Sequence, residues 1–191
     1  MLIFATVAYD KPKEHEISQI DEKLFERIAL GEKDAFFELY QQSSNAIFSY
    51  ALSLMRNRED AEDVMQETYL KIRSAAHLYS SQGKPMAWIL TIARNICMMK
   101  FRQRKHDSII PFDEIKETPD CSQIKDLEDR LVLETAFRIL SREECQIVML
   151  HAVSGLKHRE LSRLLNMPLS TVLSKYNRSI KKLRRELENK L

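Results

Sequence analysis

Residues 155–178 read GLKHRELSRLLNMPLSTVLSKYNR, and their pattern indicates how the C-terminal part of the chain folds. Its leucines recur at helical spacing, which predicts a short helix over about 157–165. The tight turn 166–168 leads into a second helix, expected over 169–188. Two helices joined by so short a turn predict a helix-turn-helix, whose second helix enters the DNA major groove. A helical hairpin with a basic tail is the alternative.

Polar and cationic side chains gather on the first turns of that second helix. A recognition helix places this end against base edges and phosphates. The candidates for contact with DNA are Ser170, Thr171, Ser174, Lys175 and Arg178.

The rest of the composition also favours helices. The chain has 191 residues, with only 3 Gly and 5 Pro. Sandwiches, barrels and Rossmann-type folds need many more turn residues than this. We therefore predict an all-α protein with two small helical domains, the C-terminal one a helix-turn-helix. The expected boundaries are an N-terminal arm over 1–20, a first domain over 21–105, a flexible acidic linker over 106–122 and a second domain over 123–191.

Charge is segregated along the chain, although the formal net charge is only +2. Residues 84–105 and 175–185 are basic and contain no acid, whereas residues 59–67 are acidic and contain no base. Any one such run is ordinarily a solvated helix face. Two acid-free basic helices, one in each domain, are what two separate contacts with a phosphate backbone require.

Several kinds of chemistry have no sequence signal here. Cys97, Cys121 and Cys145 are far apart and the histidines lack ligand spacing, so we expect reduced thiols, no disulfide, no metal and no cofactor. No nucleophile–base pair or phosphate-binding loop points to an enzyme. The short apolar start is followed by Lys11 and Lys13, the wrong order for a secretory signal, so we expect a cytoplasmic protein without membrane insertion.

Two further motifs carry a resemblance to a known family. Residues 58–68 read REDAEDVMQET, and residues 87–95 read AWILTIARN. In this order and spacing they resemble the −10 domain (region 2) of bacterial RNA polymerase sigma factors of the extracytoplasmic-function type, over residues 31–105. Residues 130–185, with the helix-turn-helix, resemble the −35 domain (region 4).

The resemblance implies that an acidic helix face binds core RNA polymerase. In the family this face docks on the clamp helices of the largest subunit, and the flap is a further contact. Opposite charges would steer association there more than they add affinity. The alternative is that the acidic residues of this helix only keep its surface soluble. The matching residues are Asp60, Asp63, Gln66 and Glu67.

The resemblance also implies that the loop 78–84 and the helix after it open the −10 DNA. Opening requires capture of an unstacked base by a pocket with polar and cationic neighbours. Expected near this pocket are Tyr79, Gln82, Lys84 and Asn95; expected at phosphates are Arg94, Lys100, Arg102 and Lys105. We expect Trp88 to lie in the core.

The helix-turn-helix departs from the family pattern at three positions. Ser162 stands where a small Ala is usual, and Asn166 stands where the turn usually has Gly, although Asn tolerates the left-handed conformation. Leu173 stands where the recognition helix commonly has Lys, which removes a phosphate contact and weakens the expected affinity for the −35 element.

The expected partners are core RNA polymerase, promoter DNA and an anti-sigma factor. A free-standing helix-turn-helix regulator with an N-terminal sensing or dimerisation unit is the alternative, and an adaptor that sequesters an anti-sigma factor is a third interpretation. The acidic linker either mimics nucleic acid in a polymerase channel or serves as a disordered tether.

Overall fold

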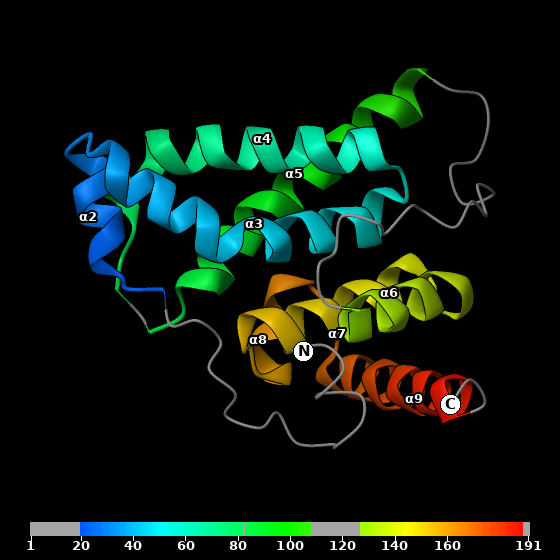
Figure 1. Cartoon of the computed structure of the whole chain (residues 1–191). Coiled ribbons are helices and arrows are strands. Elements are labelled where there is room, and N and C mark those ends of the chain that lie inside the picture. Colours follow the sequence, from blue (N-terminus) through cyan, green and yellow to red (C-terminus); the bar gives the residue numbers. More distant parts are fainter. Residues whose placement is uncertain (1–19, 82, 108–126, 189–191) are drawn as a thin grey trace.

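The computed structural model describes residues 20–81, 83–107 and 127–188 (Figure 1). These residues form eight α-helices and one short 3-10 helix and contain no strand, which confirms the all-α prediction. The first group is α2 (Lys23–Ala29), α3 (Lys33–Met55), α4 (Arg58–Ala75), η1 (Ala76–Leu78) and α5 (Pro85–Asp107). The second group is α6 (Leu127–Ile139), α7 (Arg142–Ser154), α8 (His158–Leu164) and α9 (Leu169–Glu188).

Local signals explain where the helices of the first group start and stop. Gly31, with φ of +87°, follows the end of α2, and Arg56 ends α3 in the left-handed conformation with φ of +54°. The side chain of Asn57 accepts a hydrogen bond of 3.0 Å from the backbone N–H of Asp60 and so caps α4. Pro85 opens α5, where a missing N–H costs nothing.

The second group follows its sequence signals equally closely. Ser141 and Glu144 form a capping box at the start of α7, and Gly155 ends that helix with φ of +66°. Asn166 adopts φ of +52° in the turn between α8 and α9, so Asn does supply the left-handed residue that Gly usually supplies. The expected helix-turn-helix is present, with α8 slightly shorter than expected.

In the first group, α3, α4 and α5 pack against one another, and α2 with η1 covers one end. An aromatic cluster fixes that end. The ring of Tyr79 stacks on Phe25 at a centroid distance of 4.1 Å, and Trp88 meets both rings edge-on. Trp88 is partly buried against the core, as the apolar stripe predicts.

In the second group, α7 is the central helix. It packs on α6, α8 and α9 and, on its other side, on α3 and α5 of the first group. Ile147 and Leu150 are fully buried because neighbours cover α7 on several sides. Leu161 of α8 and Val172 of α9 are also fully buried, and they hold the helix-turn-helix together.

The two groups of helices share one contiguous core, a contact that the sequence analysis did not predict. In Figure 1, α3 lies between α4 and the second group. The buried amide of Gln146 donates a hydrogen bond of 3.3 Å to the hydroxyl of Tyr50, and the guanidinium of Arg56 donates one of 2.6 Å to the carbonyl of Leu140. Polar groups therefore fix the register of this contact.

Cys97 and Cys145 are buried free thiols, as expected. Burial raises the pKa of each to about 12, which keeps both protonated and unreactive at neutral pH. None of the described helices combines the length and apolarity of a membrane span. Cys121, Gln82, the arm over residues 1–19 and most of the expected linker lie outside the described residues.

Candidate protein and nucleic-acid interfaces

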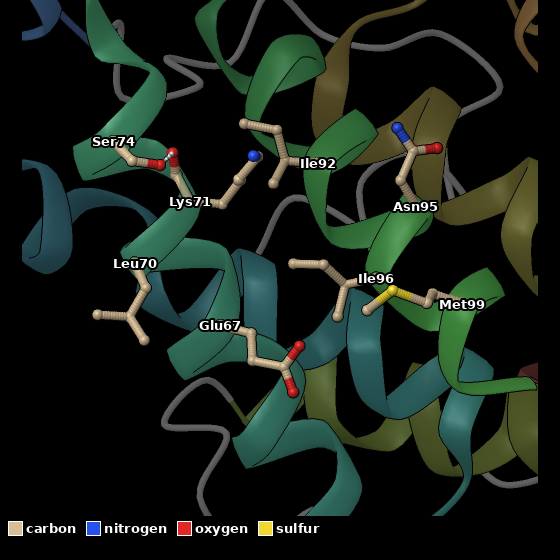
Figure 2. A pocket seen from close by; sticks show the side chains of 8 residues that line it. All are labelled: Glu67, Leu70, Lys71, Ser74, Ile92, Asn95, Ile96 and Met99. Atoms are coloured by element: carbon tan, nitrogen blue, oxygen red, sulfur yellow. Dashed lines mark hydrogen bonds between the residues drawn. The ribbon is translucent and has the colours of Figure 1, made fainter. Parts of the chain in front are cut away.

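A surface groove of about 510 Å³ runs between α4 and α5 (Figure 2). Two apolar side chains of its lining are exposed to water: Leu70 is 59% exposed and Met99 is 46% exposed. Exposed apolar side chains around a hollow are typical of a protein-binding surface. The lining residues are Glu67, Leu70, Lys71 and Ser74 from α4, and Ile92, Asn95, Ile96 and Met99 from α5.

The acidic face of α4 borders this groove, and cations of α5 lie against it. Lys100 Nζ is 2.6 Å from Glu67 Oε1 and 3.9 Å from Asp63 Oδ2, and Arg104 pairs with Asp60. The side chain of Asp60 is only 16% exposed, whereas that of Asp63 is 63% exposed. The acidic segment of α4 and the basic segment of α5, which look independent in sequence, therefore partly neutralise each other's charge in the folded protein.

The four residues expected to bind polymerase thus differ in availability. Asp63 and Gln66 are the most open, Glu67 is half-buried at the groove, and Asp60 is largely covered by its partner from α5. The structure places all four on α4, with Glu67 in the groove itself.

The residues expected around a captured −10 base have different partners. The hydroxyl of Tyr79 donates a hydrogen bond of 2.6 Å to Glu22, and Lys84 Nζ lies 2.6 Å from Glu160 Oε2 of α8. This contact lowers the pKa of Glu160, first through the hydrogen bond from Lys84. Asn95 is exposed and lines the α4–α5 groove.

The expected phosphate contacts on α5 also separate by exposure. Arg102 is exposed, and Lys100 is 18% exposed in its ion pairs. Arg94 is half-buried, and its Nε has no hydrogen-bond partner among the described residues. Lys105 belongs to α5, but its side chain is outside the described part.

On α9 the exposed residues form one stripe, starting at Ser170 and including Leu173, Ser174, Asn177 and Arg178. Thr171, also expected at DNA, lies beside this stripe and is less exposed, since it is half-buried. The stripe continues through Lys181. Sequence reasoning missed Asn177 and Lys181, although both follow from Ser170 at helical spacing.

Lys175 and Lys182 lie along one edge of the exposed stripe of α9, where they anchor the helix to α7. Lys175 Nζ is 2.5 Å from Glu143 Oε2, and Lys182 Nζ is 2.9 Å from Glu144 Oε1. Burial raises the pKa of Glu144, but the hydrogen bonds from Ser141 and Lys182 outweigh it, and the net pKa is lowered. Lys175, expected at DNA, thus has an internal partner.

A ring cluster supports the helix-turn-helix from behind. His151 of α7 and His158 of α8 stack at a centroid distance of 4.4 Å, and both meet Tyr176 of α9 edge-on. Desolvation, then the charge of His151, lowers the pKa of His158. No spacing signal in the sequence pairs these two histidines.

Two segments of the chain match family profiles. Residues 39–106 match the profile described as Sigma-70 region 2, and residues 130–183 match that described as Sigma-70, region 4. Together they take up more than half of the chain and contain α4, nearly all of α5, α8 and most of α9. The free-standing regulator is therefore not favoured.

Curated relatives agree over most of the chain. The chain is 27% identical over 172 residues to the ECF RNA polymerase sigma factor BldN of Streptomyces coelicolor, a match that covers 86% of this chain and 65% of BldN. It is 26% identical over 172 residues to the ECF RNA polymerase sigma factor SigK of Mycobacterium tuberculosis, covering 86% of this chain and 92% of SigK.

Solved structures share the fold. CnrH, in complex with the cytosolic domain of CnrY, has a TM-score of 0.58 at 19% identity and covers 89% of this chain and 98% of CnrH. The sigma factor RpoE, in complex with the anti-sigma factor NepR from Bartonella quintana, has a TM-score of 0.59 at 23% identity, covering 82% and 98%. With both sigma regions in family order, the chain belongs to the sigma-70 family and is a promoter-recognising sigma factor of the extracytoplasmic-function type.

Proposed function

We propose that this chain binds core RNA polymerase through the α4–α5 groove and its acidic rim, reads the −10 element with α5 and the loop before it, and reads the −35 element with α9. Residues 21–105 and 123–191 are the two functional domains in this proposal. The observation that carries it is the groove, because it joins exposed apolar side chains to carboxylates on the helix that holds the region 2 motif.

The groove has the composition of a protein-binding surface. Leu70 and Met99 supply apolar area that a partner would remove from water, and Asp63 supplies a solvated charge at the rim. Binding energy concentrates in such a desolvated centre, whereas rim charges mainly speed association. A basic helical partner, such as the clamp helices of the polymerase largest subunit, fits both parts.

A partner that covers the same groove would inhibit the protein. The two solved neighbours are complexes, one of CnrH with the cytosolic domain of CnrY and one of RpoE with the anti-sigma factor NepR. We infer that an anti-sigma factor is a partner of this chain as well, and that it competes with polymerase.

On the −10 side, Arg102 is the most open cation of α5 with a described side chain, and Asn95 is an exposed amide on the α5 wall of the groove. An amide can hydrogen-bond the edge of an unstacked base, and Arg102 can bind the backbone beside it. On the −35 side, the exposed stripe of α9 presents hydroxyls, an amide and the guanidinium of Arg178 to the major groove.

The polymerase contact is tested by changing the groove while leaving the core intact. Leu70→Ser and Met99→Ser remove apolar area that is exposed in the free chain, so folding should be preserved. We expect each variant to bind core polymerase about tenfold more weakly in a fluorescence titration, since loss of a central apolar contact costs about 1–2 kcal/mol. Leu30→Ser is the matched control, because Leu30 is 81% exposed but does not line the groove.

Equal affinity for the Leu30→Ser and Leu70→Ser variants would remove the groove from the polymerase interface. The promoter-reading part is tested by run-off transcription from a genomic promoter library with core polymerase and the full chain. Transcripts whose start sites share a −35 and a −10 element upstream support the proposal. DNA binding by the chain without polymerase, and no transcripts with it, would instead support a free-standing regulator.

A further inference from the structure

Leu173 is an apolar side chain on the otherwise hydrophilic exposed stripe of α9. It is 38% exposed, and it is the only exposed large hydrophobic residue in the described part of that helix. Its neighbours Val172 and Tyr176 are buried at 0% and 8% exposure. The core face of α9 is therefore already filled without Leu173, which points away from it.

The residues around Leu173 are shorter or engaged elsewhere. Ser170 and Asn177 lie one turn before and one turn after it on the same stripe. The hydroxyl of Ser174 donates a hydrogen bond of 3.2 Å to the carbonyl of Thr171, so it is held against its own helix. The methyl groups of Leu173 are consequently the bulkiest feature that this part of the stripe offers to a ligand.

A leucine can neither neutralise a phosphate nor hydrogen-bond a base edge. The apolar group that B-DNA displays in the major groove is the C5-methyl of thymine, and apolar side chains recognise it by contact. We propose that Leu173 is a specificity-determining residue that contacts a thymine C5-methyl in the −35 element. This inference rests on the proposed function, because it requires α9 to enter the major groove.

The experiment uses the full chain assembled with core polymerase. Duplexes with a randomised −35 region upstream of a fixed −10 region are first enriched by binding to the wild-type holoenzyme. Each thymine in the enriched −35 sequence is then replaced singly by deoxyuridine, which removes the methyl group and keeps every hydrogen-bonding atom. Affinities are measured in one buffer, since binding to DNA depends strongly on salt.

We expect one thymine whose replacement weakens binding about fourfold, the effect of removing one methyl group from an apolar contact. In the Leu173→Ala variant the same replacement should have no effect. Leu30→Ala is the matched control, because it truncates a leucine that is 81% exposed and lies outside the helix-turn-helix, and it should keep the fourfold preference. Leu173→Lys should also lose the preference. Its affinity for all the duplexes should depend more steeply on salt concentration, because the added cation can bind a phosphate.

Two results overturn the inference without touching the proposed function: an enriched sequence in which thymine and deoxyuridine bind equally at every position, or a preference that survives Leu173→Ala. Failure of the wild-type holoenzyme to enrich any −35 sequence would instead overturn the proposed function, and the inference with it. Thermal melting of each variant confirms that the exposed substitution leaves the fold intact.

Discussion

The two basic helices, α5 and α9, look alike in sequence and differ in the folded protein. On α5, Lys100 and Arg104 face carboxylates of α4. On α9, the paired Lys175 and Lys182 are seven residues apart and share the side that faces α7, while Arg178 lies on the exposed stripe. A run of positive charge in a sequence therefore does not state how much charge is available to DNA, because acids on neighbouring helices decide it.

The difference has a consequence for how each helix works. The paired lysines of α9 stabilise its orientation, so its exposed side can present a fixed pattern to the major groove. The cations of α5 instead pair with the same acidic face of α4 that we propose for polymerase. Polymerase would therefore compete with Lys100 and Arg104 for these carboxylates. Four predictions test this difference between α5 and α9.

The largest effect is expected where α9 depends on packing. Leu161→Ala removes a fully buried side chain of α8 that holds the recognition helix in place. We expect a loss of about 2–5 kcal/mol in the free energy of unfolding, measured by urea denaturation, because the substitution leaves a cavity. Leu164→Ala, at a half-buried position of the same helix, should cost clearly less. Equal losses would mean that α8 does not brace α9 through Leu161.

The next effect concerns the pairing between α4 and α5. Lys100→Glu places a third carboxylate beside Glu67 and Asp63, and it should lower the free energy of unfolding by about 1 kcal/mol. The exchanged double variant Lys100→Glu/Glu67→Lys restores opposite charges, so its stability should recover in denaturant titrations. Its affinity for core polymerase should nevertheless fall below that of the wild type, because a cation replaces the carboxylate at position 67 of the acidic rim. Wild-type affinity in the double variant would show that Glu67 acts only within the chain.

A smaller effect separates the exposed and the paired cations of α9. Arg178→Ala should weaken −35 binding and lower the slope of log affinity against log salt by about one, as expected for one lost phosphate contact. Lys182→Ala removes a cation that pairs with Glu144, so the slope should stay as in the wild type. The comparison between α5 and α9 breaks down if the Lys182→Ala variant shows the larger change in slope.

The smallest effect is a pH dependence confined to the second group of helices. Because the pKa of His158 is lowered in the fold, the unfolded chain takes up a proton first, and stability should fall as pH drops through the ordinary histidine range near 6.5. His158→Phe keeps a ring against His151 and Tyr176 and removes this titration. Thermal melting between pH 7.5 and 5.5 should therefore show a weaker decline for this variant than for the wild type.

Much of the local structure could be predicted, because it depends on residues close in sequence. The capping box at Ser141, the left-handed Asn166 and the limits of α9 all follow from short-range geometry. The positions of Asp63 and Gln66 on one exposed helix face were likewise accessible from helical spacing.

Contacts between distant segments could not be predicted. Tyr50 belongs to an apolar stripe that would look the same if it packed only within its own group, yet its hydroxyl meets Gln146, 96 residues away. Lys84 looked available to DNA, and its partner Glu160 lies 76 residues away, on the helix-turn-helix. Leu70 was not singled out because one exposed leucine has no periodic signal; only the groove gives it meaning.

The two buried thiols make the contact between the helix groups measurable. The pKa of Tyr50 is raised mainly by burial, and the thiol of Cys97 adds to that rise. The thiol of Cys145 donates a hydrogen bond of 3.8 Å to the carbonyl of Ala136. Each side of the contact thus carries a native chemical probe that reacts only when it is uncovered. In a Cys121→Ser chain, the rate at which an alkylating reagent modifies the remaining thiols reports how often the two groups of helices separate. The rate can be measured for the free chain and for the chain bound to core polymerase.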